Sequence, residues 1–247
     1  MDTFAEYDFQ VRSYECGPQG YASLPTVCNY LQEAASMHAE MLGFSKSNFA
    51  AAGANISWVL TRLRVKMVRY PRWEERVTVG TYPRGGRRIT ANRDFLLSIG
   101  GETIGVATSE WMIIDLATRK IVSVPESVYA LANDVRAPVL GENAFSRLRW
   151  MCRENAGETM FRALRGDIDL NGHVNNVHYV EWMMETLPDG VGMIGDFEIA
   201  FKSETLAGEE VRAASVEVTP GVWAAHVASL DGRDHVVAEL RASSAFR

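Results

Sequence analysis

Hydrophobic and polar positions along the chain follow two periods in turn. Near the beginning, Tyr7 and Phe9 alternate with polar residues, which predicts a short strand. Residues 23–44 instead carry apolar side chains at spacings of three and four, with Pro25 suited to a first helical turn and Gly43 to a helix end. The stripe comprises Val27, Tyr30, Leu31, Ala34, Met37, Met41 and Leu42. These residues predict one amphipathic helix after the first strand.

Strands are predicted after this helix. In residues 62–67, apolar Leu63, Val65 and Met67 alternate with three basic residues, so the two sets occupy opposite faces of a strand. The pair Gly100-Gly101 predicts a tight hairpin between strands at residues 94–99 and 103–114. The first half therefore follows the order strand, helix, several strands.

The second half repeats this order. Its predicted elements are a strand near 158–164, a loop at 167–173, a helix at 175–186 and strands at 196–202, 211–219, 222–229 and 235–243. Superposing Tyr30-Leu31 on Tyr179-Val180 aligns the helices at an offset of 149, and superposing residues 75–77 on 209–211 aligns the following strands at an offset of 134. Residues 122–155, with Pro125, Pro138 and Gly141, are predicted to link the halves. The pattern predicts a duplicated α+β unit.

Charge and composition narrow the classes of function. The net charge of −6 over 247 residues argues against general nucleic-acid binding. No apolar stretch approaches the roughly 20 residues of a membrane span, and the acidic first residues resemble no signal or transit peptide, so we expect a cytoplasmic protein. Three widely spaced cysteines, Cys16, Cys28 and Cys152, fit reduced thiols better than disulfides or a metal site.

One segment is strongly basic. Residues 62–88 contain nine basic residues against Glu74 and Glu75, a balance of +7 that leaves −13 for the rest of the chain. The nine are Arg62, Arg64, Lys66, Arg69, Arg72, Arg76, Arg84, Arg87 and Arg88. Two interpretations stay open: a surface for an anionic partner, or solvated strand faces.

The residues before the second helix are candidates for chemistry. Asp169, Asn171 and His173 are spaced by two, so in an extended stretch they project to one side. A helix start also offers free N–H groups and the positive end of its dipole, which can stabilise an oxyanion. Taken singly, Asp169 and Asn171 are equally typical of turns, and Asn175 and Asn176 of helix caps. Their combination at one junction favours acyl chemistry.

Glu204, just after a predicted strand, is either a surface charge or a fourth member of this site. By the two offsets, Asp169 corresponds to Gly20 and Glu204 to Tyr70, so the first half lacks both carboxylates. We therefore expect one site per chain, with the first half free to bind an apolar portion of the substrate. No nucleophile elbow, phosphate-binding loop or metal-spaced cluster of His and Cys is present, and the other histidines are interpreted as structural.

The run from Asp169 through Asn171, Gly172, His173 and Asn175-Asn176 to Tyr179 resembles the catalytic segment of acyl-acyl carrier protein thioesterases, a family that includes plant plastid enzymes. In the first half, Trp58-Val59-Leu60-Thr61-Arg62, Arg69-Tyr70-Pro71-Arg72-Trp73, Trp111-Met112-Ile113-Ile114-Asp115 and Thr118-Arg119 carry the same resemblance.

The resemblance implies a tandem (double) hot-dog fold, with two antiparallel sheets each wrapped around one long helix. It implies an N-terminal hot-dog domain (1–133) that binds the acyl chain, a linker (134–155) and a C-terminal catalytic hot-dog domain (156–247). The implied reaction is hydrolysis of acyl thioesters on acyl carrier protein, an acidic partner for residues 62–88. Because a tandem pair already satisfies the hot-dog dimer, a monomer is expected as well as a homodimer.

The resemblance assigns catalytic roles to Asp169, Asn171, His173 and Glu204, and no metal or organic cofactor. Plant members have a cysteine directly after the glutamate where this chain has Thr205, so a mechanism that needs that cysteine cannot operate here. Two mechanisms stay open. Either Glu204 or Asp169 activates a water molecule, or Asp169 attacks the thioester itself.

Three alternative functions remain at this point. The fold also accommodates thioesterases that act on coenzyme A esters, and hydro-lyases that use a histidine and a carboxylate to dehydrate hydroxyacyl chains. A non-catalytic acyl-binding module is the third alternative.

Overall fold

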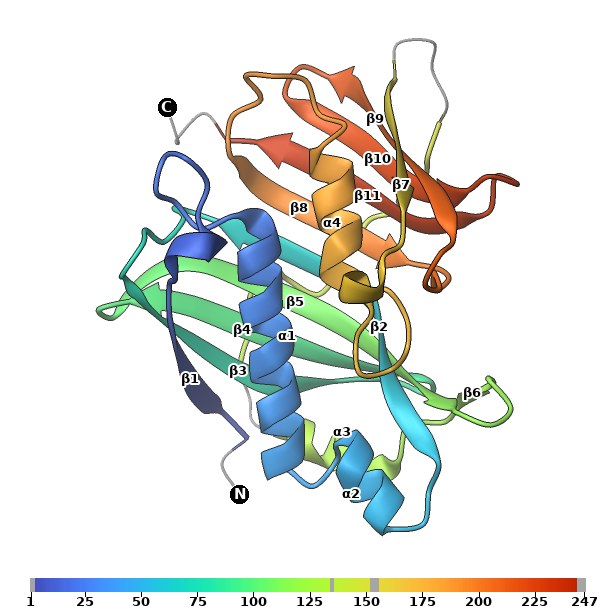
Figure 1. Cartoon of the computed structure of the whole chain (residues 1–247). Helices are drawn as coiled ribbons and strands as arrows, with labels where there is room; N and C mark the ends of the chain where they lie inside the picture. Colours follow the sequence, from blue (N-terminus) through green and yellow to red (C-terminus); the bar gives the residue numbers. More distant parts are fainter. Residues whose placement is uncertain (1–2, 134–135, 152–155, 244–247) are drawn as a thin grey trace. The chain divides into compact units, whose positions relative to one another are not determined.

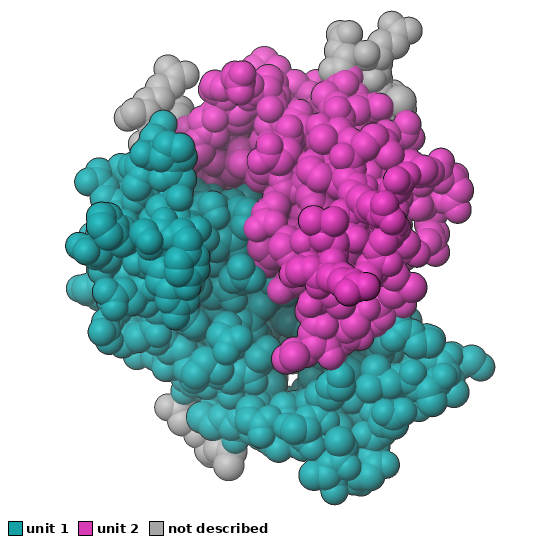
Figure 2. Space-filling model, viewed as in Figure 1, with its two compact units in different colours: residues 1–144 teal, residues 145–247 magenta. Residues whose placement is uncertain are grey.

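The computed structural model describes residues 3–133, 136–151 and 156–243. Figure 2 distinguishes two compact units, residues 1–144 and residues 145–247. None of the helices in the described ranges is long and apolar enough to cross a membrane. Cys16 and Cys28 are free thiols, whereas Cys152 lies outside the described residues.

Unit 1 is an antiparallel sheet with one principal helix (Figure 1). Its elements are β1 (Ala5–Gln10), η1 (Ser13–Glu15), α1 (Leu24–Met41), α2 (Lys46–Ala51), β2 (Ile56–Met67), β3 (Arg76–Arg87), β4 (Thr90–Ile99), β5 (Glu102–Asp115), β6 (Ile121–Val122), α3 (Glu126–Ala130) and η2 (Leu131–Asn133). The strand order is β1-β3-β4-β5-β2, and β6 pairs with β5. The alternation predicted for residues 62–67 is confirmed, because Leu63, Val65 and Met67 are buried.

The helix α1 begins where the sequence predicts. Ser23 caps it by accepting a hydrogen bond from the Thr26 amide, and Pro25 lies in its first turn. The buried face of α1 packs on β3 and β1, and the Tyr30 ring stacks on Phe9 of β1 at a centroid distance of 4.8 Å. The apolar stripe therefore fixes the helix on the sheet.

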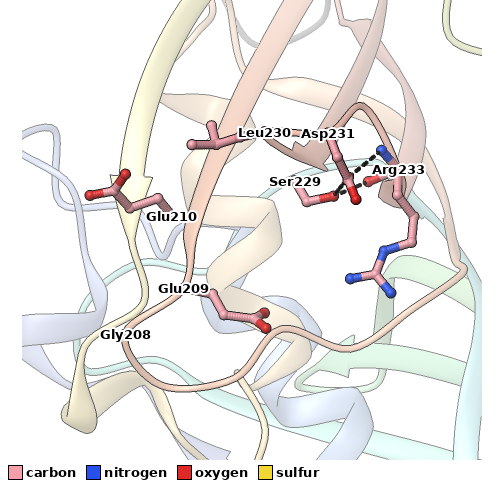
Figure 3. A pocket seen from close by; sticks show the side chains of 7 residues that line it. All are labelled: Gly208, Glu209, Glu210, Ser229, Leu230, Asp231 and Arg233. Carbon is pink, nitrogen blue, oxygen red and sulfur yellow. Dashed lines mark hydrogen bonds between the residues drawn. The ribbon is translucent and has the colours of Figure 1, made fainter.

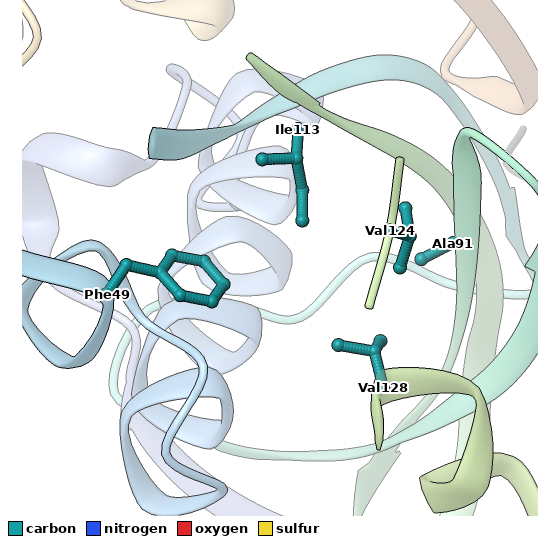
Figure 4. Close-up of a cluster of buried hydrophobic side chains, with 5 residues drawn as sticks. All are labelled: Phe49, Ala91, Ile113, Val124 and Val128. Atoms are coloured by element: carbon teal, nitrogen blue, oxygen red, sulfur yellow. The ribbon is translucent and has the colours of Figure 1, made fainter. Parts of the chain in front are cut away.

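Two short helices in unit 1 were not predicted. They bring Phe49 of α2 and Val128 of α3 into a buried cluster with Ala91, Ile113 and Val124 (Figure 4). The prediction that all of residues 122–155 form a linker is therefore wrong for its first part, where α3 is a helix packed on β3. Further along, the Val139 amide donates to the buried Asp94 carboxylate at 3.1 Å, which attaches this stretch to unit 1.

Unit 2 likewise consists of antiparallel strands with one helix of its own (Figure 1). Its elements are β7 (Gly157–Arg162), η3 (Arg165–Asp167), α4 (Asn176–Met184), β8 (Ile194–Phe201), β9 (Glu210–Thr219), β10 (Val222–Ser229) and β11 (Asp234–Ala242). Within this unit the strand order is β8-β11-β10-β9-β7. Trp182 of α4 stacks on Phe161 of β7 at 5.6 Å, as Tyr30 stacks on Phe9 in unit 1.

The backbone hydrogen bonds of the two units repeat. The Gly17 amide donates to the Tyr21 carbonyl at 2.9 Å, and 152 positions later the Asp169 amide donates to the His173 carbonyl at 2.8 Å. After each loop, the next amide donates to a second segment: Ala22 donates to the Pro71 carbonyl in unit 1, and Val174 donates to the Thr205 carbonyl in unit 2. The two accepting residues are 134 positions apart. The internal repeat is therefore present in the hydrogen-bond pattern, with offsets of 152 and 134.

The offset of 149 predicted for the helices is wrong. Both helices begin at residues 152 apart, Leu24 and Asn176, and the stacked pairs Phe9–Tyr30 and Phe161–Trp182 follow the same offset. Asp169 therefore corresponds to Gly17 and not to Gly20. The second predicted offset, which pairs Glu204 with Tyr70, agrees with the hydrogen bonds.

Candidate active site

The loop that carries the predicted site is a tight turn and not the extended stretch that the spacing of its residues suggested. The Gly172 amide donates to the Asp169 carbonyl at 3.0 Å, and residues Ile168 and Val174 close the loop by an isolated bridge. Gly172 has a φ of 84°, a left-handed conformation in which a side chain would be strained. The glycine therefore allows the turn that presents His173.

The Asp169 carboxylate organises this turn. One of its oxygens accepts the backbone amides of Asn171 at 2.7 Å and His173 at 3.4 Å, and the other accepts the Asn171 side-chain amide at 3.2 Å. This arrangement is an Asx turn, in which an aspartate binds the backbone two residues ahead. Asp169 thus fixes both Asn171 and His173.

The fourth predicted residue reaches the same place from another element. Glu204 follows β8, and its Oε2 lies 3.1 Å from Nε2 of His173. The Val174 amide donates to the Thr205 carbonyl at 3.0 Å, so the two segments are joined beside this pair. Both side chains keep solvent access, with exposed fractions of 23% for His173 and 42% for Glu204. The structure therefore brings all four predicted residues together.

The start of α4 is less open than the sequence suggested. Asn175 is the cap, because its side chain accepts the Val177 amide at 3.1 Å and its carbonyl accepts the His178 amide. Two amides of the first turn are thus engaged within the chain.

Three other histidines of unit 2 have protein partners. His178 lies 2.6 Å from Glu181, and this hydrogen bond raises the pKa of His178. His226 and His235 are buried, and burial lowers the pKa of each. The sequence placed none of them in the site, but His235 lies beneath the segment that carries Glu204, because its carbonyl accepts the amides of Lys202 and Ser203.

Unit 1 has the same loop with different side chains. By the offsets of 152 and 134, Asp169, Asn171 and His173 correspond to Gly17, Gln19 and Tyr21, and Glu204 corresponds to Tyr70. No carboxylate or imidazole occurs at these positions. Tyr21 instead accepts a hydrogen bond from Arg72 at 2.7 Å.

A separate apolar cavity lies within unit 1. Its volume is about 100 Å³, and it is partly open to solvent. Residues of its lining include Ala35, Ala39, Phe44, Trp58, Ala91 and Trp111.

The two tryptophans of this cavity have hydrogen-bond partners in the protein, whereas the buried Oδ1 of Asn92 in the lining has none among the described residues. The indole N–H of Trp58 donates to the Phe44 carbonyl and that of Trp111 donates to Ser109, so the rings can present apolar surface. Arg93 supplies a polar wall. Burial lowers its pKa to about 10, and its Nη1 lies 2.7 Å from Nδ1 of His38.

A second hollow, in unit 2, contains none of the four predicted site residues (Figure 3). Its lining consists of Gly208, Glu209, Glu210, Ser229, Leu230, Asp231 and Arg233. Asp231 accepts hydrogen bonds from the Ser229 hydroxyl and from the Arg233 amide. Across the described part of the chain, no group of three or more His, Cys, Asp or Glu side chains could hold a metal ion.

In unit 2, an imidazole and two carboxylates lie together beside the start of a helix, an arrangement suited to proton transfer. Family models define the class more closely. Residues 2–132 match the N-terminal domain of acyl-ACP thioesterases, and residues 152–241 match the C-terminal domain. The chain therefore belongs to the acyl-ACP thioesterase family.

Individual relatives agree with this assignment. The chain is 33% identical over 197 residues to oleoyl-acyl carrier protein thioesterase 1 of Arabidopsis thaliana, a match that covers 74% of this chain and 54% of that protein. The chain thus spans about half the length of the curated relatives it matches.

Solved structures show the fold. An acyl-ACP thioesterase from Bacteroides thetaiotaomicron superposes with a TM-score of 0.87 at 25% identity, over 98% of each chain. The 12:0-ACP thioesterase from Umbellularia californica gives a TM-score of 0.86 at 25% identity, over 98% of this chain and 97% of that one. The fold is of the hot-dog type.

Proposed function

We propose that this chain hydrolyses the thioester of fatty acyl-acyl carrier protein, releases the free fatty acid and so terminates chain elongation. The observation that carries the proposal is the 3.1 Å pair of His173 and Glu204 beside the turn organised by Asp169. An imidazole held by a carboxylate is a standard arrangement for moving a proton to or from a reacting group. Family membership supports acyl-acyl carrier protein as the substrate class.

The proposed domain organisation is a tandem hot-dog. Residues 1–133 form an N-terminal hot-dog domain, 134–155 a linker and 156–247 a C-terminal catalytic hot-dog domain, in each of which a sheet wraps around its helix. The separate family matches at 2–132 and 152–241 support this division. The absence of Asp, Glu and His at the four corresponding positions of unit 1 supports one site per chain.

The acyl chain is assigned to the apolar cavity of unit 1. A cavity lined mainly by apolar and aromatic side chains, with polar groups at Ser36, Asn92 and Arg93, suits a hydrocarbon chain. Because α1 forms part of the lining through Ala35 and Ala39, small changes in the size of these side chains should decide which chain lengths fit.

In the proposed mechanism, Glu204 and His173 activate a water molecule. The water oxygen attacks the thioester carbon, its proton passes to the pair, the carbon–sulfur bond breaks and the thiol leaves with a proton. Asn171 stabilises the negative charge on the carbonyl oxygen. The three hydrogen bonds to the Asp169 carboxylate support this version, because a carboxylate so engaged is a weaker nucleophile.

The alternative is direct attack by Asp169 to form a mixed anhydride, which water then hydrolyses. A single turnover in oxygen-18 water can reveal the anhydride, because water that attacks its aspartyl carbon leaves label in the Asp169 carboxylate. We expect no label in the Asp169 carboxylate, and label retained there would establish the anhydride route.

The proposed function is tested by measuring free thiol over matched panels of acyl-carrier-protein and coenzyme A thioesters. We expect thiol release, with higher kcat/KM on the carrier protein. Higher kcat/KM on coenzyme A esters would identify an acyl-CoA thioesterase, and dehydration of a hydroxyacyl chain without thiol release would identify a hydro-lyase. Binding without turnover, unchanged by Asp169→Asn or Glu204→Gln, would identify a binding module.

The basic segment 62–88 is the proposed surface for the acidic carrier protein. Several of its arginines have acidic partners in unit 1: Arg69 pairs with Glu75, Arg76 with Asp8, and Arg84 with Asp94. Arg87 and Arg88 are exposed at the end of β3 and make no ion pair with the described residues. These two arginines are therefore the part of the segment best able to meet an anionic partner. A cytoplasmic location and a monomer or homodimer stay predictions.

A further inference from the structure

Three polar side-chain atoms are buried near Glu204 and make no hydrogen bond in the described part of the chain. The atoms are the hydroxyl of Tyr179 on α4, the hydroxyl of Thr205 and Nε2 of His235 on β11. These residues expose 2%, 0% and 0% of their surface. Buried polar groups in folded proteins are almost always hydrogen-bonded, so three together call for a physical explanation.

The three groups are neighbours. The rings of Tyr179 and His235 stack at a centroid distance of 6.4 Å and an interplanar angle of 22°. Burial raises the pKa of Tyr179 to about 12, and Thr205 lies close enough to the phenol to oppose part of that shift. Burial lowers the pKa of His235, and the backbone of Ser203 and Glu204 raises it in part. The His235 ring therefore lies beneath the same segment.

The segment that carries Glu204 needs such support, because it forms no regular strand. The Ser203 hydroxyl lies 3.0 Å from Nδ1 of His235, and Thr205 is buried, whereas Glu204 is partly exposed and meets the histidine of the site. Inward and outward side chains therefore alternate, and the contacts of the two inward residues set the position of the glutamate between them.

Packing alone does not require the hydroxyl of Tyr179. Its ring meets Trp182 and Phe201 edge to face at 5.4 Å and 6.3 Å, contacts that a phenylalanine would also make. The hydroxyl thus adds a polar atom to an apolar environment.

The duplicated unit provides an internal comparison. In unit 1, the amides of Val68 and Arg69 donate to the Ile104 carbonyl, as those of Lys202 and Ser203 donate to the His235 carbonyl in unit 2. Ile104 is thus the counterpart of His235. At the offsets of 152 and 134, Val27 is the counterpart of Tyr179, and Pro71 that of Thr205. Where the loop has no glutamate, all three positions are apolar.

We propose that Tyr179, Thr205 and His235 form a buried hydrogen-bond network, closed by one internal water molecule, that holds Glu204 in place against His173. The three are positioning residues. A buried water with about three polar partners is a common structural element, and the same backbone folds in unit 1 without these groups. The proposal rests on the proposed function, because it assigns the network to the glutamate of that site.

The test compares Thr205→Val, which removes the hydroxyl and keeps the shape, with Thr205→Ser, which keeps the hydroxyl. We expect Thr205→Val and Tyr179→Phe to fold, to lower kcat about tenfold or more through misplacement of the glutamate and to leave KM for the thioester unchanged. Thr205→Ser should retain most of the kcat. Thr186→Val, which removes another buried hydroxyl of unit 2, should leave kcat unchanged because that hydroxyl, among the described residues, donates to the Met183 carbonyl and not to the segment of Glu204.

Wild-type kcat in folded Thr205→Val, or an equal loss of kcat in Thr205→Ser, would overturn the proposal. A readout without turnover separates it from the proposed function. In nitrogen-15 spectra of the full chain, Tyr179→Phe should shift the His235 Nε2 resonance and Thr186→Val should not. A chain that releases no thiol but shows this shift would contradict the proposed function while supporting the network, and an unchanged His235 resonance in Tyr179→Phe would refute the network.

Discussion

Replacing Ala39 of α1 by leucine tests whether the cavity of unit 1 receives the acyl chain. Ala39 and Ala35 are one helical turn apart and both line the cavity, so a larger side chain at position 39 enters space that the chain would occupy. Leucine is also a good helix former, and α1 should therefore be retained.

The magnitude follows from the volume added. Leucine has about three more carbon atoms than alanine, and each methylene kept out of an apolar site loses about 0.8 kcal/mol. Excluding about three methylenes thus removes ~2.4 kcal/mol from the binding of the longest substrates. At 1.36 kcal/mol for each factor of ten, kcat/KM for those substrates should fall about 60-fold relative to substrates about three carbons shorter.

The assay is thiol release from a series of saturated acyl-carrier-protein thioesters that differ by two carbons. We expect the optimum of Ala39→Leu to move to a shorter chain while kcat on short chains is retained. Met37→Leu is the matched control, because Met37 lies on the same helix, is 43% exposed and does not line the cavity. An unchanged chain-length profile in folded Ala39→Leu would refute the assignment of the chain to this cavity.

Three further predictions concern the site, the partner and stability. Glu204→Gln and His173→Asn should each lower kcat about 10²- to 10⁴-fold. The kcat of the double variant should be little lower than that of either single variant. Additive losses of activation free energy in steady-state kinetics would show that the two residues do not act as a pair. Reversing Arg87 and Arg88 to glutamate should raise KM for the carrier-protein thioester more than for the coenzyme A thioester, and equal changes would exclude the basic surface. Burial lowers the pKa of His235, so only the unfolded chain takes up this proton as the pH falls below about 6.5. The contribution of His235 to the free energy of unfolding is thus complete above that pH. As the pH falls from there toward the lower native pKa, this free energy decreases by up to ~1.4 kcal/mol per pH unit. Urea unfolding measured between pH 5 and 8 should show that the free energy of unfolding depends less on pH in His235→Gln than in the wild type. The same pH dependence in both would contradict the assignment of this effect to His235.

Elements with a strong period could be predicted from the sequence, and the short helices could not. The helix α1 and the alternating strands bury one face, so their periods record the burial directly. The helices α2 and α3 span six and five residues and contribute one buried residue each, Phe49 and Val128. A single buried residue carries no period, which explains why these helices were missed.

The alignment of the repeat shows a different limit. Matching Tyr30 to Tyr179 placed the helices at an offset of 149 because the two residues are identical, whereas the hydrogen bonds require 152. Backbone hydrogen bonds persist when side chains change, so they preserve the correspondence better than identity does. At the corrected offset, Tyr30 corresponds to Trp182, and the conserved property is aromatic stacking on the first strand.

The candidate site could be predicted in composition but not in geometry. The spacing of Asp169, Asn171 and His173 suggested an extended stretch, yet Gly172 closes a turn in which the aspartate binds its own loop. The distance between His173 and Glu204 depends on a contact between residues 31 positions apart, which no local pattern contains. The assignment of roles to these residues stays a prediction.

Duplication explains why one unit can hold the proposed site and the other the proposed acyl cavity. The shared hydrogen-bond frame folds with Tyr179, Thr205 and His235 in unit 2 and with apolar residues in unit 1, so the frame itself does not require buried polar groups. Each unsatisfied buried polar group would cost about 1–3 kcal/mol. Such groups therefore persist at a cost in stability. Their presence beneath Glu204, and not at the corresponding place in unit 1, is the expected result if the polar residues serve the site rather than the fold.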